Sequence, residues 1–262
     1  MIRYFVTLAY KGTAYHGWQT QPNALSVQQV LEERLSLKLR QPIKLTGAGR
    51  TDTGVHASFY MAHFDSTTPL SNRQTLIRSI NSFLPHDIKI FDIVPVKPDA
   101  HARFDAQSRT YHYFFATAPS PFLHEYVWQL PYIPDLQLLQ TTLKMLEGRH
   151  DFEAFSKKDK SAKTSICTIT DTLVAKTTFG FYIKITADRF LRNMVRAIVG
   201  TLIHISKNNL PPHHILEVLE SKNRSQAASS APPQGLFFTG VDYPEHIFVE
   251  QKPNPIKNFL LP

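Results

Sequence analysis

Residues 47–57 read Gly-Ala-Gly-Arg-Thr-Asp-Thr-Gly-Val-His-Ala and continue into Ser-Phe-Tyr-Met. Glycines tolerate positive φ and let a ligand approach the backbone, whereas the apolar and aromatic run from residue 57 is typical of a strand. A dinucleotide-binding fingerprint also begins Gly-x-Gly, but it needs a third glycine and a helix after the loop. The stretch therefore predicts a loop that enters a β-strand, with Asp52 and Arg50 held at the edge of a sheet.

Strand patterns surround this loop at residues 3–10, 43–48, 57–65 and 88–96. Two helices are predicted between them, because residues 26–29 (Ser-Val-Gln-Gln) and 71–74 (Ser-Asn-Arg-Gln) have the form of capping boxes. Apolar residues follow each box at helical spacing, and Pro85 ends the second helix. The order βαββαβ indicates a ferredoxin-like antiparallel sheet with helices on one face.

The second half of the chain roughly repeats this order. Strands are predicted near 109–117, 166–176, 180–187 and 236–242, and helices near 135–147 and 190–206. Asp135 and Gly148 are the expected cap and stop of the first of these helices. Residues 156–165 and 222–234 are expected to be loops. The pattern predicts an α+β protein with two halves, residues 1–105 and 106–262.

Composition limits the classes of function. The chain has 262 residues and 42% apolar content, which suffices for a large core, and no apolar run reaches membrane-spanning length. The alternating N-terminus indicates a first strand rather than a signal peptide. Cys167 is the single cysteine, which excludes an internal disulfide or a cysteine-rich zinc site and favours a reducing compartment, by default the cytoplasm. The net charge of +8 is shared by both halves and favours a polyanionic partner such as a nucleic acid.

Several interpretations of Asp52 are open from its spacing alone. It could be a catalytic carboxylate, a turn residue that binds its own backbone, or half of a surface ion pair with Arg50. The tripeptide Asp52-Thr53-Gly54 also occurs in aspartic proteases, but these enzymes need two carboxylates that share a proton. No second Asp-Thr-Gly is present. Only a symmetric dimer could supply the second carboxylate, and a neighbouring arginine would disfavour the shared proton.

Three further segments combine positive charge with other chemistry. Residues 100–113 interleave arginine, histidine and aromatic side chains, which suits RNA but also fits a strand with buried tyrosines. Arg189, Arg192 and Arg196 recur at i, i+3 and i+7 and predict a cationic stripe on a helix, or an ordinary solvated face. Residues 157–163 place four lysines on a loop, which is either a phosphate contact or a solvated loop.

Residues 49–57 resemble the catalytic loop of the tRNA pseudouridine synthase A family, which is commonly written GRTDAGVHA. Other stretches agree with that family in order and spacing: residues 10–19, 102–104, 109–113, 189–196 and 235–237. Thr53 stands where alanine is commoner in the family, and residues 58–61 lack a Gly-Gln pair often found there. The resemblance runs from residue 10 to about residue 243, and such collinearity is highly specific.

The resemblance implies the pseudouridine synthase fold, in which two ferredoxin-like halves form a continuous, mainly antiparallel sheet with a central RNA-binding cleft. It implies an isomerase that forms a homodimer, binds the tRNA anticodon stem-loop and converts uridines 38, 39 and 40 to pseudouridine. No cofactor and no metal are implied. Two alternatives are the same chemistry on a different RNA, and an RNA-binding protein in which Asp52 is only structural.

The same resemblance assigns roles to residues. It makes Asp52 the essential nucleophile or base at the sugar, and Arg50 a residue that holds the flipped-out nucleotide. It pairs Arg196 with Asp52 and stacks Tyr111 on the uracil ring. It also implies two regions of tRNA contact: Ala100, His101, Ala102, Arg103 and Phe104, and the lysine loop Asp159, Lys160, Ser161, Ala162 and Lys163.

Overall fold

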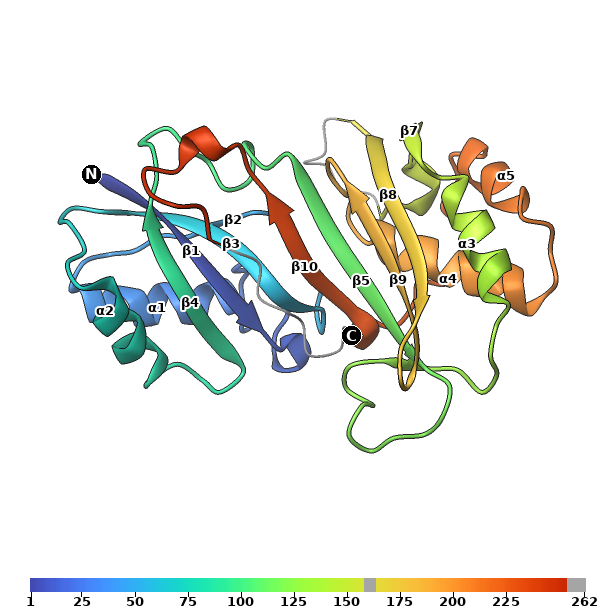
Figure 1. Ribbon diagram of the computed structural model, residues 1–262, viewed down its shortest axis with the longest axis horizontal. Helices are drawn as coiled ribbons and strands as arrows, with labels where there is room; N and C mark the ends of the chain where they lie inside the picture. The colour runs from blue at the N-terminus through green and yellow to red at the C-terminus, as the bar shows by residue number, and fades with distance from the viewer. Residues whose placement is uncertain (158–163, 254–262) are drawn as a thin grey trace. The chain divides into compact units, whose positions relative to one another are not determined.

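The computed structural model describes residues 1–157 and 164–253 (Figure 1). These residues form two compact units. The first unit contains Met1–Gln107 together with the described residues from Phe238 onward, and the second contains Ser108–Phe237. The predicted halves, 1–105 and 106–262, differ from these units mainly at the C-terminus, because the segment from Phe238 packs with the first unit.

The first unit has the predicted βαββαβ order. Its elements are β1 (Ile2–Tyr10), α1 (Val27–Leu39), β2 (Thr46–Gly47), β3 (His56–Ser66), α2 (Arg73–Asn81) and β4 (Ile88–Pro95). The strands lie in the order β4-β1-β3, and both β2 and β10 (Leu236–Asp242) are neighbours of β3. All the pairs of β1 and β2 are antiparallel, with Phe5 opposite both His63 and Val94.

Local hydrogen bonds explain where the first unit departs from the sequence prediction. The strand expected at 43–48 is reduced to Thr46–Gly47, because Ile43 N–H donates to Ser36 Oγ and Leu45 N–H donates to Glu32 Oε1 instead of to a neighbouring strand. Ser26 caps α1 as predicted, accepting from Gln29 N–H. The second capping box is wrong by one residue.

The cap of α2 is Asn72 rather than Ser71. Asn72 has φ 48°, and its side chain accepts a hydrogen bond from the N–H of Thr75. Asparagine tolerates this left-handed conformation better than most residues and still supplies a capping oxygen. The helix therefore begins at Arg73.

The second unit follows a similar order. Its strands are β5 (Ser108–Ala116), β6 (Trp128–Gln129), β7 (Gly148–Asp151), β8 (Ile166–Lys176) and β9 (Gly180–Ala187), and its helices are α3 (Leu136–Lys144), α4 (Met194–Lys207) and α5 (His214–Glu220). The strands lie in the order β5-β9-β8-β7 with antiparallel pairs, and β6 pairs with β5 in parallel. Short 3-10 turns occur in both units: at Gly12–Ala14 and Glu245–Ile247 in the first, and at Glu153–Phe155 and Pro233–Gly235 in the second.

The start of α4 corrects the predicted cationic stripe. The helix begins at Met194 rather than at 190, since Asn193 adopts φ 65° immediately before it. Arg189 and Arg192 therefore precede the helix, and only Arg196 lies on it. The strand β7 and the helix α5 are further elements that the sequence patterns did not predict.

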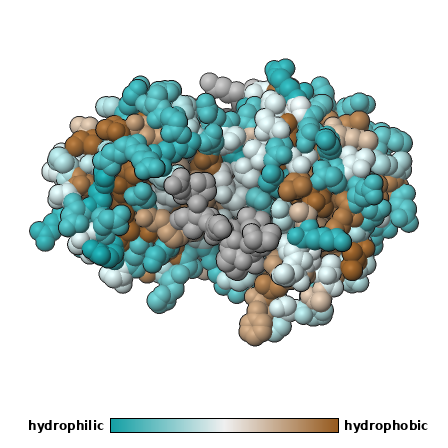
Figure 2. All heavy atoms as spheres, viewed as in Figure 1, coloured by the Kyte–Doolittle hydropathy of each residue, from teal (hydrophilic) through white to brown (hydrophobic). Residues whose placement is uncertain are grey.

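The α+β class with mainly antiparallel strands is confirmed. The core is rich in aromatic rings, and the largest fully buried side chains include Phe5, Tyr60, Tyr113 and Tyr243. The face drawn in Figure 2 is largely hydrophilic, with apolar residues in smaller groups. None of the helices in the described parts of the chain is long and apolar enough to cross a membrane. A continuous sheet with a central cleft stays a prediction.

Candidate active site

The Asp52 loop connects β2 to β3 in the first unit. Arg50 is exposed and Asp52 is half-buried, so both side chains are accessible from the loop. Gly54 has φ 77°, and its N–H donates to the carbonyl of Tyr15 at 3.3 Å. The N–H of Val55 donates to the carbonyl of Asp52 at 3.1 Å, which closes a tight turn around the carboxylate residue.

Residues 10–18 pack against this loop from the end of β1. The hydroxyls of Tyr10 and Thr51 lie 2.9 Å apart, and the N–H of Trp18 donates to the carbonyl of Thr51 at 3.4 Å. A Cβ atom on Gly17 would lie only 2.2 Å from that carbonyl oxygen. The residue directly before Asp52 is thus fixed through both its side chain and its backbone.

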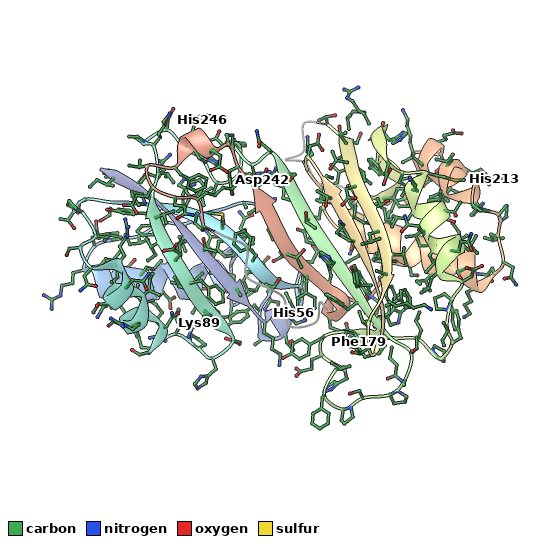
Figure 3. The ribbon with its side chains drawn as sticks, viewed as in Figure 1. His56, Lys89, Phe179, His213, Asp242 and His246 are labelled. Carbon is green, nitrogen blue, oxygen red and sulfur yellow. The ribbon has the colours of Figure 1, made fainter. Side chains whose placement is uncertain are left out.

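The other side of the loop is fixed through His56, at the start of β3 (Figure 3). His56 is buried, and its Nδ1 accepts from the N–H of Gly12 at 3.0 Å. A Cβ atom on Gly12 would lie 1.9 Å from the carbonyl oxygen of Val55. Glycine is needed at residues 12 and 17 because two loops approach each other closely, so the backbone around Asp52 is preorganised.

Aromatic rings support the glycine-rich start of the loop. The rings of Trp18 and Tyr60 have centroids 4.2 Å apart, and Tyr10 meets Tyr60 edge to face at 5.7 Å. Tyr60 donates its hydroxyl to the carbonyl of Gly49. Gly47 has no room for a side chain, since a Cβ atom there would lie 2.1 Å from the Tyr60 hydroxyl.

A second exposed feature of the first unit is the turn at residues 100–105, where the first predicted tRNA-contact region lies. Ala100 and Ala102 are buried, whereas Arg103 is exposed and the Phe104 side chain is 74% exposed. The His101 ring lies 4.2 Å from the Phe104 ring, and the Arg103 guanidinium lies 5.8 Å from it. The turn presents an aromatic ring with a cation beside it, which suits a stacked base.

Two histidines hold this turn by accepting backbone hydrogen bonds. Nδ1 of His63 accepts from Ala102 N–H at 3.0 Å, and Nδ1 of His101 accepts from Arg103 N–H at 3.1 Å. Burial, with further contributions from the charges of Arg3 and His101, lowers the pKa of His63 to about 4, and burial also lowers the pKa of His101. Both rings are therefore neutral near pH 7 and can act as acceptors.

In the second unit, Tyr111 lies on β5 opposite Ile185. Its side chain is only 8% exposed, and the Phe190 ring meets it edge to face at 5.1 Å. The neighbouring Arg109 is also buried and donates to the carbonyl of Asp188 at 2.7 Å. The rigid strand and the Phe190 ring together fix the plane of Tyr111.

Arg196 lies in the first turn of α4. Its Nε donates to the carbonyl of Ala231 at 2.8 Å, and its own carbonyl accepts from the N–H of Ala231 at 2.9 Å. The structure thus places Arg50 and Asp52 on one loop of the first unit and Tyr111 and Arg196 in the second. The pairing of Asp52 with Arg196 and the stacking of Tyr111 on uracil stay predictions. The lysine loop, Asp159, Lys160, Ser161, Ala162 and Lys163, lies outside the described residues.

The sequence reasoning missed the residues that position the loop, namely Tyr10, Gly12, Gly17, Thr51 and His56. Gly12 and Gly17, five residues apart directly after a strand, were the available signal. Among residues 1–157 and 164–253, no group of three or more His, Cys, Asp or Glu side chains is arranged to hold a metal ion.

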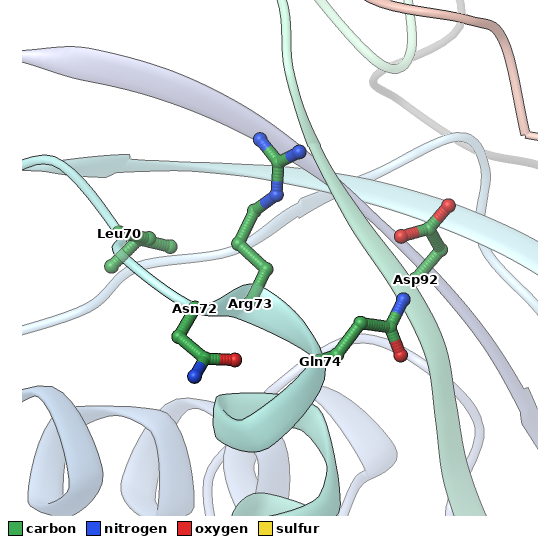
Figure 4. A pocket seen from close by; sticks show the side chains of 5 residues that line it. All are labelled: Leu70, Asn72, Arg73, Gln74 and Asp92. Carbon is green, nitrogen blue, oxygen red and sulfur yellow. The ribbon is translucent and has the colours of Figure 1, made fainter.

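Two surface cavities lie elsewhere in the first unit. Leu70, Asn72, Arg73, Gln74 and Asp92 line one of about 450 Å³, in which the first turn of α2 faces β4 (Figure 4). Arg73 there pairs with Glu250 at 2.5 Å. The other, of about 1420 Å³, runs along α1. Neither is lined by residues of the Asp52 loop.

Comparison of the sequence with known proteins identifies the family of the chain. The sequence model of the tRNA pseudouridine synthase family matches residues 7–105 and 142–244. The chain belongs to the tRNA pseudouridine synthase family. Arg50, Asp52, Arg196 and the 100–105 turn lie within the matched ranges, while Tyr111 lies between them.

Individual members of the tRNA pseudouridine synthase family are similar over nearly the whole chain. The tRNA pseudouridine synthase A of Parabacteroides distasonis is 45% identical over 248 residues, covering 95% of this chain and 98% of that protein. The protein of the same name from Porphyromonas gingivalis is 46% identical and covers 95% of this chain and 100% of its own length. A more distant one, from Chlamydia muridarum, is 37% identical and covers 94% of this chain and 95% of its own.

Among solved structures, one chain of a Cbf5–Nop10–Gar1 complex is similar at a TM-score of 0.34 and 11% identity, covering 89% of this chain and 57% of that one. This similarity is too low to inform the site. Pseudouridine synthases are isomerases, and membership of this family makes the chain an isomerase that acts in tRNA pseudouridine synthesis.

Proposed function

We propose that this protein converts uridines 38, 39 and 40 of the tRNA anticodon stem-loop to pseudouridine, with Asp52 as the catalytic carboxylate. The observation that carries the proposal is the loop around Asp52. Backbone hydrogen bonds from Trp18 N–H to the Thr51 carbonyl and from Gly54 N–H to the Tyr15 carbonyl fix the loop on both sides of Asp52, while Asp52 itself stays half-buried rather than enclosed. A preorganised carboxylate in a matched family loop is what a reaction at a single sugar carbon requires.

The proposed reaction is balanced without a co-reactant. Asp52 acts at the ribose, either by attack on C1′ or by removal of a sugar proton, and the bond from C1′ to uracil N1 breaks. The freed uracil rotates, and its C5 forms the new bond to C1′. On the first route this displaces the Asp52 oxygen from C1′, and on the second route Asp52 returns the removed proton to the sugar. The proton on C5 is lost, N1 gains a proton, and the carboxylate is regenerated, so no cofactor is proposed.

The surrounding residues have separate proposed roles. Arg50, which is exposed on the same loop, holds the nucleotide in the flipped-out state, which costs a few kcal/mol in unstacking. Arg196 pairs with Asp52 and orients its carboxylate. The buried ring of Tyr111 stacks on uracil, and its hydroxyl assists removal of the proton from C5.

Further contacts with tRNA are proposed for the 100–105 turn and for the lysine loop at 159–163. The exposed Phe104 ring supports the first of these, because base stacking on an aromatic ring contributes about 1–3 kcal/mol. A homodimer is also proposed, from the resemblance alone. The cytoplasm is proposed as the compartment because Cys167 is the single cysteine. A monomeric mass in light scattering at micromolar concentration would contradict the dimer.

The test compares wild type and Asp52→Asn on an unmodified tRNA transcript that carries uridine at positions 38, 39 and 40. Pseudouridine is mapped by base-specific chemistry, and tRNA binding is measured in parallel. We expect wild type to modify these positions and Asp52→Asn to bind tRNA without modifying it. Modification by both proteins would move the catalytic carboxylate elsewhere, and modification at other positions would contradict the substrate assignment. Binding without modification by wild type would favour an RNA-binding protein.

A further inference from the structure

The segment at residues 224–231 lies between α5 and the last strand and contains no helix or strand of its own. Its backbone therefore lacks the regular hydrogen bonds that secondary structure supplies. Arg224 replaces them. Its guanidinium donates to the carbonyls of Ala227 and Ala228, each at 3.1 Å, and to Ser230 Oγ at 2.9 Å.

The same segment packs on α4. Ser230 Oγ accepts from Asn193 Nδ2 at 2.6 Å, and Ala228 N–H donates to Thr201 Oγ1 at 3.1 Å. A Cβ atom on Gly200 would lie 2.0 Å from the carbonyl oxygen of Ser229, so the segment lies directly on the helix backbone. Arg224 thus shapes a segment that fits one face of α4 over more than one turn.

The last residue of the segment holds Arg196. Ala231 is 1% exposed and shares two hydrogen bonds with Arg196. Nε of Arg196 donates to the Ala231 carbonyl, and the Ala231 N–H donates to the Arg196 carbonyl. An arginine side chain has four rotatable bonds, and a hydrogen bond at Nε restricts the rotamers and the plane of the guanidinium. The direction in which the terminal nitrogens of Arg196 point therefore depends on where Ala231 lies.

We propose that Arg224 is a positioning residue for the isomerase reaction, and that it acts on Arg196 through the 224–231 segment. The inference rests on the proposed function, in which Arg196 orients the catalytic carboxylate. Arg224 need not touch RNA for this role. Its guanidinium sets the path of the segment, the segment sets the Ala231 carbonyl, and this carbonyl sets the Arg196 guanidinium.

The first experiment replaces Arg224 by Gln and measures pseudouridine formation in a single turnover with enzyme in excess over tRNA. We expect the rate to fall by about tenfold or more, while the tRNA dissociation constant stays within about twofold. Arg224→Lys should recover only part of the rate, because an ammonium group cannot reproduce the forked bonds. Lys222→Gln is the matched control, since it removes a positive charge two residues away and loses an ion pair with Asp151 in which the Lys222 side chain is 60% exposed.

A double-mutant cycle separates positioning from general stability. In an Arg196→Ala background, Arg224→Gln should slow the reaction by less than about twofold, because the group that it positions is gone. A full additional loss in that background would overturn the proposal, as would a weakened tRNA affinity that accounts for the whole effect. If Arg224→Gln does not fold, Ser230→Ala removes one bond of the same segment and takes its place.

A readout without RNA distinguishes failure of this inference from failure of the proposed function. The Nε–H of Arg196, bonded to the Ala231 carbonyl, should exchange with solvent slowly in NMR spectra of the free protein. Arg224→Gln should accelerate this exchange at least tenfold. An unchanged exchange rate overturns the inference. Accelerated exchange in a protein that makes no pseudouridine supports the positioning but refutes the proposed function.

Discussion

Replacing Gly17 by Ala tests whether the loop around Asp52 has to be held in place for the reaction. Gly17 has φ 83°, and a Cβ atom there would lie 2.2 Å from the Thr51 carbonyl oxygen. Alanine in a left-handed conformation costs about 1–2 kcal/mol. Because non-bonded atoms pack at about 3.5–4.0 Å, this separation must grow by roughly 1.3–1.8 Å, a shift that the new Cβ atom and the Thr51 carbonyl share.

This displacement acts on Thr51, which is the residue directly before Asp52, the carboxylate that we propose to be catalytic. A misplacement of about 1 Å at a reacting group costs about 10²-fold in rate. We therefore expect Gly17→Ala to lower the single-turnover rate by about 10²-fold and the free energy of unfolding by about 1–3 kcal/mol. A protein of ordinary stability remains folded after such a loss, since its free energy of unfolding is about 5–15 kcal/mol.

The assay measures single-turnover pseudouridine formation at saturating enzyme, with urea unfolding of the same samples. Gly49→Ala is the matched control for stability, because nothing lies within 4 Å of a Cβ atom at Gly49. Its unfolding midpoint should equal that of wild type. A folded Gly17→Ala protein with a rate within about threefold of wild type would refute the dependence of Asp52 on this contact.

Three further predictions follow from other contacts. Tyr10→Phe should lower the free energy of unfolding by about 1–3 kcal/mol, because it leaves the buried Thr51 hydroxyl without this partner. In urea unfolding, Thr51→Val should lower the free energy of unfolding less in the Tyr10→Phe protein than in wild type. Equal losses in the two backgrounds would contradict the pairing. Since the folded pKa of His63 is about 4 and its ordinary value is 6.5, the unfolded chain binds more protons in that interval. The free energy of unfolding should therefore fall by up to about 1.4 kcal/mol per pH unit, through this group, as the pH drops from 6.5 to 4. In urea unfolding across that range, the free energy of unfolding of His63→Asn should depend less steeply on pH. The same pH dependence in both proteins would exclude His63 as the cause. Phe104→Ala should leave the melting temperature unchanged and weaken tRNA binding by about 5-fold to 150-fold. Phe104→Trp should retain the affinity of wild type for tRNA. Equal affinities of the two variants in a filter-binding assay would exclude stacking.

The hydrophobic patterns predicted most strands well, because alternate residues of a strand face the core and are therefore apolar. The strands at β1, β3, β4, β8 and β9 begin and end within about two residues of the predicted limits. The helix starts were harder. Both errors, at α2 and α4, occur at an asparagine in the left-handed conformation, Asn72 and Asn193.

Apolar spacing cannot reveal such a start, because buried residues continue through it. Leu191, which precedes α4, is also buried, at 8% exposed. The shortened β2 has a different cause, since side chains of α1 replace the expected strand partner. Whether residues 43–45 bond to α1 or to a strand depends on where α1 packs, and a local sequence pattern cannot predict this.

The candidate site divides in the same way. The loop that carries Asp52 and Arg50 could be recognised from its resemblance to a family motif, because several other stretches of the chain agree with that family in order and spacing. Residue types and spacing alone predicted a loop that enters a strand and left the role of Asp52 open. The need for glycine at residues 12 and 17 arises only when a second loop comes within contact of the first. Similarly, the acceptor role of His63 depends on the N–H of Ala102, 39 residues further along the chain.

The late return of the chain to the first unit has a consequence for synthesis on the ribosome. The strand β10 is a neighbour of β3, and Phe238 packs edge to face on Tyr60 at 5.0 Å. Tyr243, just after this strand, donates its hydroxyl to the carbonyl of Ala102 at 2.6 Å. The first unit is therefore incomplete when Gln107 leaves the ribosome.

Translation of the intervening residues, 108–237, takes on the order of ten seconds at about 5–20 residues per second. During that interval β3 has an open edge toward the place that β10 will occupy, and an open edge is a template for pairing with other chains. The nascent chain thus passes through a stage in which the Asp52 loop and β3 have been synthesised but β10 has not. At that stage, chaperones that cover unpaired strands have a defined and temporary target in this protein.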